Sequence, residues 1–151
     1  MVATLNMIVR EFNRSDNAEI AQWFRDSEST RWLEAAWSES ELDQMALEES
    51  GRHYVAVEEG TVIGSIRCYL PVEDFDCHVL SYVHIAPWCR HRGIARDLIA
   101  WLLQNHGPGC KWRCYIDHEN AASMSLFDRL QWKRIDEQLG KNKMYAYEIF
   151  T

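Results

Sequence analysis

The chain has 151 residues, a mass of 17.8 kDa and a formal net charge of −7 at pH 7. This length suits one domain with its own hydrophobic core, so we expect residues 1–151 to form a single domain. Hydrophobic residues make up 47% of the chain and charged residues 26%, which excludes a disordered or fibrous protein. The acidic balance argues against nucleic acid as a partner, because duplex binding requires clustered lysine and arginine.

No apolar run reaches the length of about 18 residues that a membrane-spanning helix needs. The N-terminus also lacks a basic start followed by an apolar stretch. We therefore expect a cytoplasmic protein without a membrane partner. The five cysteines include no CxxC pair, and no cysteine or histidine pair completes a zinc-binding spacing, so reduced thiols and no bound metal are expected.

Apolar residues alternate or recur at helical spacing in a clear order along the chain. They predict a strand at 5–12, a helix around 20–24, a glutamate-rich helical region at 26–50, strands at 53–57, 61–69 and 79–86, a helix around 94–103, a strand at 110–116, a helix at 120–130, and strands at 132–137 and 144–150. This order predicts a mixed α/β sheet. The run at 79–86 is almost wholly apolar, so we expect a strand buried on both faces and parallel to 110–116.

The most informative segment is the turn that follows the strand at 79–86. It has the pattern R-x-x-G-x-A from Arg90 to Ala95 and leads directly into a helix. Gly93 and Ala95 have little or no side chain, so backbone N–H groups at the start of the helix stay uncovered. Such groups, with the positive end of the helix dipole, bind anions, and Arg90 and Arg92 add positive charge. A pyrophosphate is the natural ligand, although neither GxxxxGK[ST] nor GxGxxG is present.

This turn and the V-x-I-x-P strand ending before it resemble the acetyl-coenzyme-A loop of the GNAT superfamily of N-acyltransferases. The resemblance implies that acetyl-CoA is the co-substrate and that its pyrophosphate is bound by Arg90, His91, Arg92, Gly93, Ile94 and Ala95. It implies a GNAT-like mixed sheet of about six or seven strands flanked by helices, whose central parallel pair splays apart around the pantetheine arm. It also implies that a backbone N–H of Val83 or Ile85 stabilises the oxyanion of the reaction.

The later asparagine-led helix resembles a second family motif, N-x-x-A-x-x-L-Y-x-x-x-G-F. Asn120 and Leu126 match it, while Ser123 replaces the alanine and Trp132 the final phenylalanine. Phe127 stands where many relatives have the tyrosine that protonates the leaving thiolate. By this resemblance Asn120 and Phe127 line the cofactor site, and Phe127 has no proton to donate.

Asp117 is the candidate general base. It ends the strand that borders the splay, where several relatives place an acidic group; alternatively it stabilises the start of the helix at Asn120. His84 alternates with the cleft-facing Ile85, so we expect His84 in the core rather than at the reaction centre. In the family that the chain resembles, the odd-numbered positions of this strand face the cleft of acceptor and cofactor, which implies the same for Ser81.

An acid-rich segment favours a cationic acceptor. Residues 26–50 hold eight acids against one arginine, with Trp32 and Trp37 among them. These two rings either box an ammonium group by cation–π contact or form the inward face of an amphipathic helix. Glu73 lies in a loop that often reaches over the acceptor in relatives, and it is either an amine ligand or a solvated charge.

These features together predict transfer of an acetyl group from acetyl-CoA to a primary amine of a cationic small molecule, by direct attack. A protein N-terminus or a lysine side chain is an alternative acceptor. A non-catalytic acyl-CoA-binding module is an alternative function, which Phe127 favours. The sequence leaves both a monomer and a homodimer open.

Overall fold

The computed structural model describes residues 7–25, 41, 44, 48–73, 75–135 and 144–151. Its centre is a seven-stranded mixed sheet in the order β1-β2-β3-β4-β5-β7-β6. The strands are β1 (Met7–Glu11), β2 (Gly51–Glu58), β3 (Thr61–Tyr69), β4 (His78–Ile85), β5 (Lys111–Asp117), β6 (Lys133–Arg134) and β7 (Met144–Phe150). The helices are α1 (Asn17–Trp23), α4 (Ile94–His106) and α5 (Ala121–Arg129), with short 3-10 turns η1 (Arg14–Asp16) and η2 (Pro87–Cys89).

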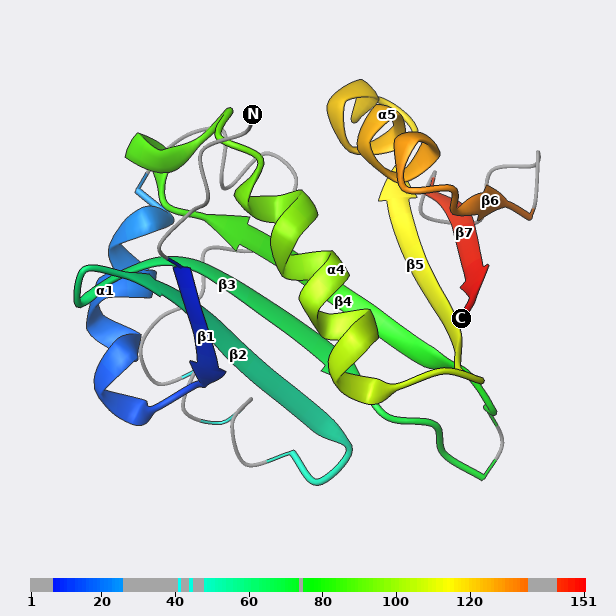
Figure 1. The fold of residues 1–151 in the computed structure, drawn as a ribbon, viewed down its shortest axis with the longest axis horizontal. Coiled ribbons are helices and arrows are strands. Elements are labelled where there is room, and N and C mark those ends of the chain that lie inside the picture. Colours follow the sequence, from blue (N-terminus) through cyan, green and yellow to red (C-terminus); the bar gives the residue numbers. More distant parts are fainter. Residues whose placement is uncertain (1–6, 26–40, 42–43, 45–47, 74, 136–143) are drawn as a thin grey trace.

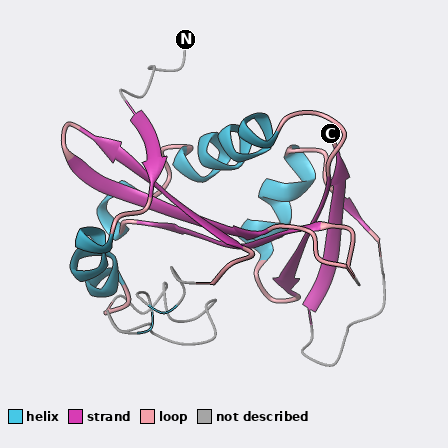
Figure 2. Cartoon of the chain, turned by 90° about the horizontal axis from the view of Figure 1, so that it is seen from below, coloured by secondary structure: helices cyan, strands magenta, loops and turns pink. Residues whose placement is uncertain are grey.

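The predicted mixed sheet is confirmed, including the parallel pair β4 and β5. Helices α4 and α5 lie over one face, and α1 lies on the other (Figures 1 and 2). The strands at 61–69 and 144–150 have the predicted bounds, whereas β2 starts two residues earlier because its ladder with β3 extends to Gly51. Among the described residues no helix is long and apolar enough to cross a membrane.

Helix α4 is fixed by its termini and by one apolar stripe. It begins after Gly93 and ends before Gly107, both at φ 78°. Its buried side chains recur at helical spacing on one face and pack on the sheet: Ile94, Leu98, Ile99 and Leu102. Gly64 of β3 allows this close approach, because a Cβ there would lie 3.0 Å from Leu98 Cδ1 and 3.2 Å from Ile85 Cδ1. The core therefore holds the start of α4 rigidly against β3 and β4.

Strand β4 contains a β-bulge at Ser81. Arg67 of β3 pairs with Tyr82 and the next residue, Cys68, pairs with Leu80, so Ser81 has no partner in β3. The bulge explains why both His78, which contacts His106 of α4, and Ile85 face α4, although they are seven residues apart. Strict alternation would place them on opposite faces.

Two sequence-based expectations for β4 are therefore wrong. The strand is not buried on both faces: Leu80, Tyr82 and His84 are buried, but Ser81 is exposed and its odd-numbered neighbours are half-buried. The odd-numbered positions also do not share one face, since Val79 points away from α4 while Ile85 points towards it. The buried side chains instead stand at the even-numbered positions 80, 82 and 84, and the bulge changes which residues face α4.

Candidate functional site

The central strands β4 and β5 are joined at one end only. Their parallel ladder consists of His78 paired with Trp112 and Val79 paired with Arg113. Beyond this point β4 continues to Ile85 and β5 continues to Asp117, but the two strands no longer pair with each other. They diverge, as Figure 1 shows. The splay predicted from the sequence is therefore present. It leaves backbone groups on both strands without a sheet partner in the described structure.

The unpaired edge of β4 offers hydrogen-bond donors to the splay. Ala86 donates its N–H to Ile63 O of β3 at 2.9 Å. Because successive N–H groups of a strand point to alternate sides, those of Val83 and Ile85 point away from β3 and into the splay. Both residues stay half-buried. The oxyanion role expected for the N–H of Val83 or Ile85 remains a prediction.

The turn between β4 and α4 forms an anion cradle. His91 and Gly93 both have positive φ, at 65° and 78°, so the chain folds tightly back before the helix. No side chain caps the N-terminus of α4. The first N–H groups of the helix, which have no intrahelical acceptor, and the helix dipole are therefore available to an anion. Ile94 itself is 1% exposed, so it can contribute only its backbone to a ligand.

Three arginines surround this cradle, and the structure assigns them different partners. Arg92 donates to Glu58 Oε2 at 2.7 Å, which raises its pKa, and it also contacts Cys89 Sγ at 3.6 Å. Arg90 is half-buried in the turn. Arg96 has its guanidinium beside Gly93, because a Cβ on Gly93 would lie 2.8 Å from Arg96 Nη2. Its Nε donates to Asp97 Oδ1 at 3.2 Å, and 47% of its side chain is exposed. A role of Arg96 beside a bound phosphate is a prediction that the sequence did not suggest.

Helix α5 borders the other side of the splay. Asn120 caps it, accepting from the Ser123 N–H at 3.2 Å. Phe127 is 6% exposed and packs its ring edge-on against Trp132, with centroids 5.0 Å apart. Phe127 is thus part of the core, whereas Asn120 is half-buried at the start of α5, and the contact of both side chains with the cofactor remains a prediction.

Asp117 lies at the open end of β5, where its side chain already has local partners. Its Oδ1 accepts from the Glu119 N–H at 2.8 Å and lies 3.5 Å from His118 Nδ1. Asp117 therefore holds the turn before α5 through the Glu119 N–H, while Asn120 caps the helix. Its role as a base and its alternative role in stabilising the helix both remain predictions.

The structure describes only some of the residues that we predicted to bind the acceptor. Trp32 and Trp37 lie outside the described residues. Glu73 is exposed in the loop before β4, and Ser81 is the exposed residue of the bulge. His84 lies in the core as predicted, 4% exposed, with its ring against Trp23 and Phe24 of the α1 side.

A buried polar network that no sequence pattern indicates lies on the α1 face of the sheet. His53 Nε2 lies 2.6 Å from Ser65 Oγ and 2.8 Å from the Tyr82 hydroxyl, and these two oxygens are 3.2 Å apart. Burial raises the pKa of Tyr82 far above its ordinary value. His53 Nδ1 is buried without a hydrogen-bond partner in the described structure. The network keeps three polar side chains neutral inside the core.

Lowering the pH is expected to destabilise the fold through His53. Burial and the positive charge of Arg67 lower its pKa to about 3, whereas an unfolded-chain histidine titrates near 6.5. Between these values the unfolded state binds more protons, so the stability present above about pH 6.5 decreases as the pH falls towards 3. Urea unfolding at pH 7.5 and 5.5 measures the change in the free energy of unfolding. One titrating group can change this free energy by at most about 1.4 kcal/mol per pH unit. A His53→Gln variant should show a weaker pH dependence; an unchanged slope would contradict the assignment.

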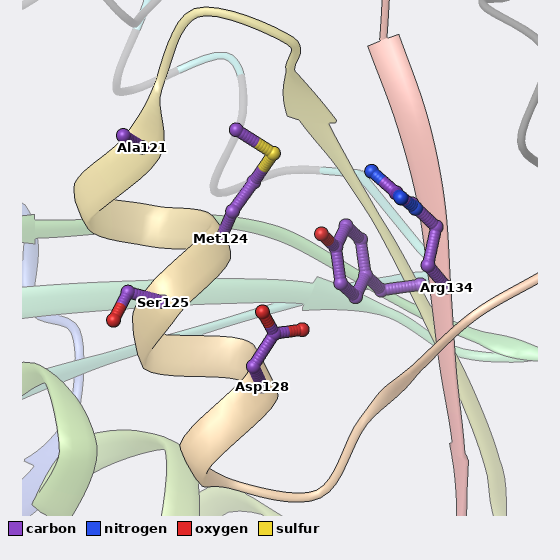
Figure 3. A pocket seen from close by; sticks show the side chains of 6 residues that line it. Ala121, Met124, Ser125, Asp128 and Arg134 are labelled. Atoms are coloured by element: carbon purple, nitrogen blue, oxygen red, sulfur yellow. The ribbon is translucent and has the colours of Figure 1, made fainter.

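One pocket in the described structure lies outside the splay. It occupies about 560 Å³ between α5, Arg134 of β6 and Tyr147 of β7. Figure 3 shows Met124, Asp128 and Arg134 extending into this space. None of the predicted site residues lines it. Within the described residues, no three histidine, cysteine or acidic side chains gather in a way that would hold a metal ion.

Comparison with known proteins agrees with this geometry. The model of the acetyltransferase (GNAT) family matches residues 17–132. No curated protein sequence matches the chain.

Solved structures share the fold at low sequence identity. A spermidine N-acetyltransferase from Vibrio cholerae, in complex with CoA and spermine, is 16% identical with a TM-score of 0.77, covering 95% of this chain and 93% of that one. The PaiA N-acetyltransferase from Thermoplasma acidophilum, in complex with coenzyme A, is 15% identical with a TM-score of 0.77, covering 96% and 99%. The aminoglycoside acetyltransferase AAC(6')-Ib, in complex with coenzyme A, is 14% identical with a TM-score of 0.75, covering 95% and 94%.

Proposed function

Because the chain belongs to the acetyltransferase (GNAT) family and is therefore an acyltransferase, we propose that it transfers an acetyl group from acetyl-CoA to a primary amine of a small, positively charged acceptor. One observation carries this proposal: the anion cradle at the start of α4 lies next to the edge of β4 that parts from β5. Three structural neighbours are described as complexes with coenzyme A, which supports the same co-substrate here.

Acetyl-CoA would lie along this edge from cradle to splay. The first N–H groups of α4, together with Arg90 and Arg96, would bind the pyrophosphate. The pantetheine arm would take the place of the missing rungs between β4 and β5. The thioester oxygen would then accept from the N–H of Val83 or Ile85, whose preorganised dipoles stabilise the charge that develops on this oxygen.

The reaction is direct attack of the amine on the thioester. A C–N bond forms, the C–S bond breaks, the amine loses a proton to a base, and the leaving sulfur gains one. Asp117 is our candidate for the base, because it lies at the open end of the splay. Phe127 donates no proton, but a thiol with a pKa near the reference value of about 8.5 leaves without obligatory assistance. The amine's own proton or water can therefore protonate the thiolate.

No cysteine needs to act as a nucleophile in this scheme, and the thiols of Cys68, Cys77 and Cys114 are poorly suited to that role. Burial raises the pKa of Cys68 to about 12 and also raises those of Cys77 and Cys114. A thiol that stays protonated at neutral pH is a weak nucleophile. Direct transfer without a covalent enzyme intermediate is the simpler mechanism.

A positively charged acceptor is supported by charge and by two neighbours. The chain has a net charge of −7, with acids concentrated in residues 26–50. One neighbour is described as a spermidine N-acetyltransferase and another as an aminoglycoside acetyltransferase, and both names refer to cationic amines.

A thiol-release assay tests the proposal. The purified protein with acetyl-CoA should release CoA with basic amines from a panel of amines, amino acids and peptides. Raising the ionic strength should increase the KM of the best acceptor more than that of acetyl-CoA, because salt shortens the Debye length to about 8 Å at 0.15 M. A non-ionic osmolyte is the control and should leave both KM values unchanged. An anionic best acceptor with a salt-insensitive KM would contradict the proposed substrate class.

A further inference from the structure

Strand β5, which forms one side of the splay, has one open face. Its even-numbered side chains from Trp112 to Ile116 are buried, whereas all its odd-numbered ones are half-buried or exposed. Trp112 contacts His106 of α4, so the buried side chains face α4 and α5. Because the side chains of a strand alternate between its two faces, the odd-numbered ones share the opposite face. The described structure therefore leaves this face of β5 open beside the splay.

Tyr115 is the one exposed residue of β5, and it lies where this strand borders the splay. It is 49% exposed. The last pair between β4 and β5 joins Val79 to Arg113, so Tyr115 belongs to the part of β5 that has separated from β4. The Tyr115 hydroxyl accepts from Arg113 Nη1 at 3.4 Å, and Arg113 Nη2 donates to Glu148 Oε1 at 3.2 Å. The ring is thus held by a guanidinium whose charge a carboxylate balances.

An apolar strip, which we define as Tyr115, Ala146 and Ile135, crosses the open face from the splay to the edge of the sheet. Tyr115 pairs with Ala146 of β7. Ile135 directly follows β6, the edge strand, and donates its N–H to Ala146 O at 3.0 Å, so it continues the row. Paired side chains lie on the same face with Cβ atoms about 5 Å apart. Ile135 is 46% exposed and Ala146 is half-buried, so the apolar strip is accessible to solvent.

The apolar strip lies between two rows that carry charge. The row towards the closed end of the splay consists of Arg113 paired with Glu148, which in turn pairs with Lys133. The row towards the open end begins with Asp117, our candidate base. Two positions along a strand span about 7 Å. An amine beside Asp117 would therefore have the apolar strip within reach of its carbon skeleton.

The cofactor and the acceptor would approach the splay from opposite faces. The anion cradle belongs to α4, which lies with α5 over one face of the sheet (Figures 1 and 2). Acetyl-CoA that reaches from the cradle into the splay would occupy that face. The open face of β5, which carries the apolar strip, is then the side from which the acceptor can enter.

We propose that the apolar strip binds the carbon skeleton of the acceptor while the reacting nitrogen lies at the splay. This inference rests on the proposed function and narrows the acceptor to a cationic primary amine with an apolar chain or ring. The strip crosses three neighbouring strands, so it offers a surface about 10 Å long. Its first side chain, Tyr115, stands on the strand that borders the splay, which makes the apolar strip continuous with the reaction site.

The test compares ethylamine with hexylamine in steady-state thiol release, because the two amines have the same charge and differ in apolar length. The wild type should have a kcat/KM about tenfold higher for hexylamine, since the additional methylenes leave water on the strip. Tyr115→Ser should bring this ratio close to one, Ile135→Ser should lower it, and Tyr115→Phe should keep it.

Phe150→Ser is the matched control. Phe150 is 73% exposed and pairs with Lys111, so it is an exposed aromatic residue on the same face as Tyr115. It lies four positions along β7 from Ala146, about 13 Å from the apolar strip. The Phe150→Ser variant should have the wild-type ratio of kcat/KM values. A fall of the ratio in Tyr115→Ser but not in Phe150→Ser would support the inference.

The other outcomes separate this inference from the proposed function. A wild type with equal kcat/KM for both amines, or a Tyr115→Ser variant with the wild-type ratio, would overturn the role of the apolar strip and leave the proposed function standing. A wild-type dimer that dissociates in Tyr115→Ser, as measured by sedimentation velocity, would assign the strip to a second copy of the chain and would also overturn the inference. A wild type that binds coenzyme A but releases no thiol with any amine would contradict the proposed function itself.

Discussion

Replacing Gly93 by valine is expected to lower the affinity for coenzyme A at least a hundredfold, a loss of about 2.7 kcal/mol in binding free energy. Gly93 has φ 78°, a conformation that a β-branched residue rarely adopts. A Cβ at this position would also displace Arg96, whose Nη2 would be only 2.8 Å away. The substitution therefore disturbs both the N–H cradle and the arginine beside it. Calorimetric titration with coenzyme A measures the effect.

Gly60→Val is the matched control for backbone strain. Gly60 lies in the turn between β2 and β3 with φ 79°, and a Cβ there would have no atom within 4 Å. Both variants should lose similar stability in thermal unfolding, but only Gly93→Val should lose affinity. Equal losses of affinity would assign the effect to general strain. Undiminished affinity in Gly93→Val would remove the basis for placing the pyrophosphate at this turn.

The parts of the site that could be predicted are those fixed by short stretches of sequence. The turn from Arg90 to Ala95 is one example, because a strand ending, a glycine and a helix start follow one another within a few residues. The splay was also predicted, but only through the resemblance to a family. No local sequence pattern indicates that β4 and β5 separate after two residue pairs.

The parts that escaped prediction depend on contacts between distant segments. The ion pair of Arg67 and Glu48 joins residues 19 positions apart, and the buried network joins His53 to Tyr82 across 29 positions. A polar residue within a strand has no sequence signature that distinguishes burial with a partner from exposure. The bulge at Ser81 was missed for the same reason, since it exists only in the register between β3 and β4.

Replacing Trp112 by alanine is expected to destabilise the protein by about 3–5 kcal/mol, the range for a large aromatic residue removed from a core. Trp112 is fully buried and pairs with His78 at the closed end of the splay. Its ring stacks on His78 with centroids 4.5 Å apart and meets the edge of His106 at 5.1 Å. For a domain of this size the midpoint of thermal unfolding should fall by roughly 10 °C.

Trp88→Ala provides the control, because Trp88 is 62% exposed and contacts Trp23 only edge-on, with centroids 6.3 Å apart. The Trp88→Ala variant should lose less than about 1 kcal/mol of unfolding free energy.

Trp112→Phe keeps an aromatic ring between the two histidines and should recover more than half of the stability lost in Trp112→Ala. If Trp112 also sets the point where β4 and β5 separate, the phenylalanine variant should bind coenzyme A more tightly than the alanine variant at a temperature where both are folded. Equal affinities at that temperature would limit Trp112 to a role in stability, and a Trp112→Ala protein as stable as Trp88→Ala would contradict its place at the centre of the core.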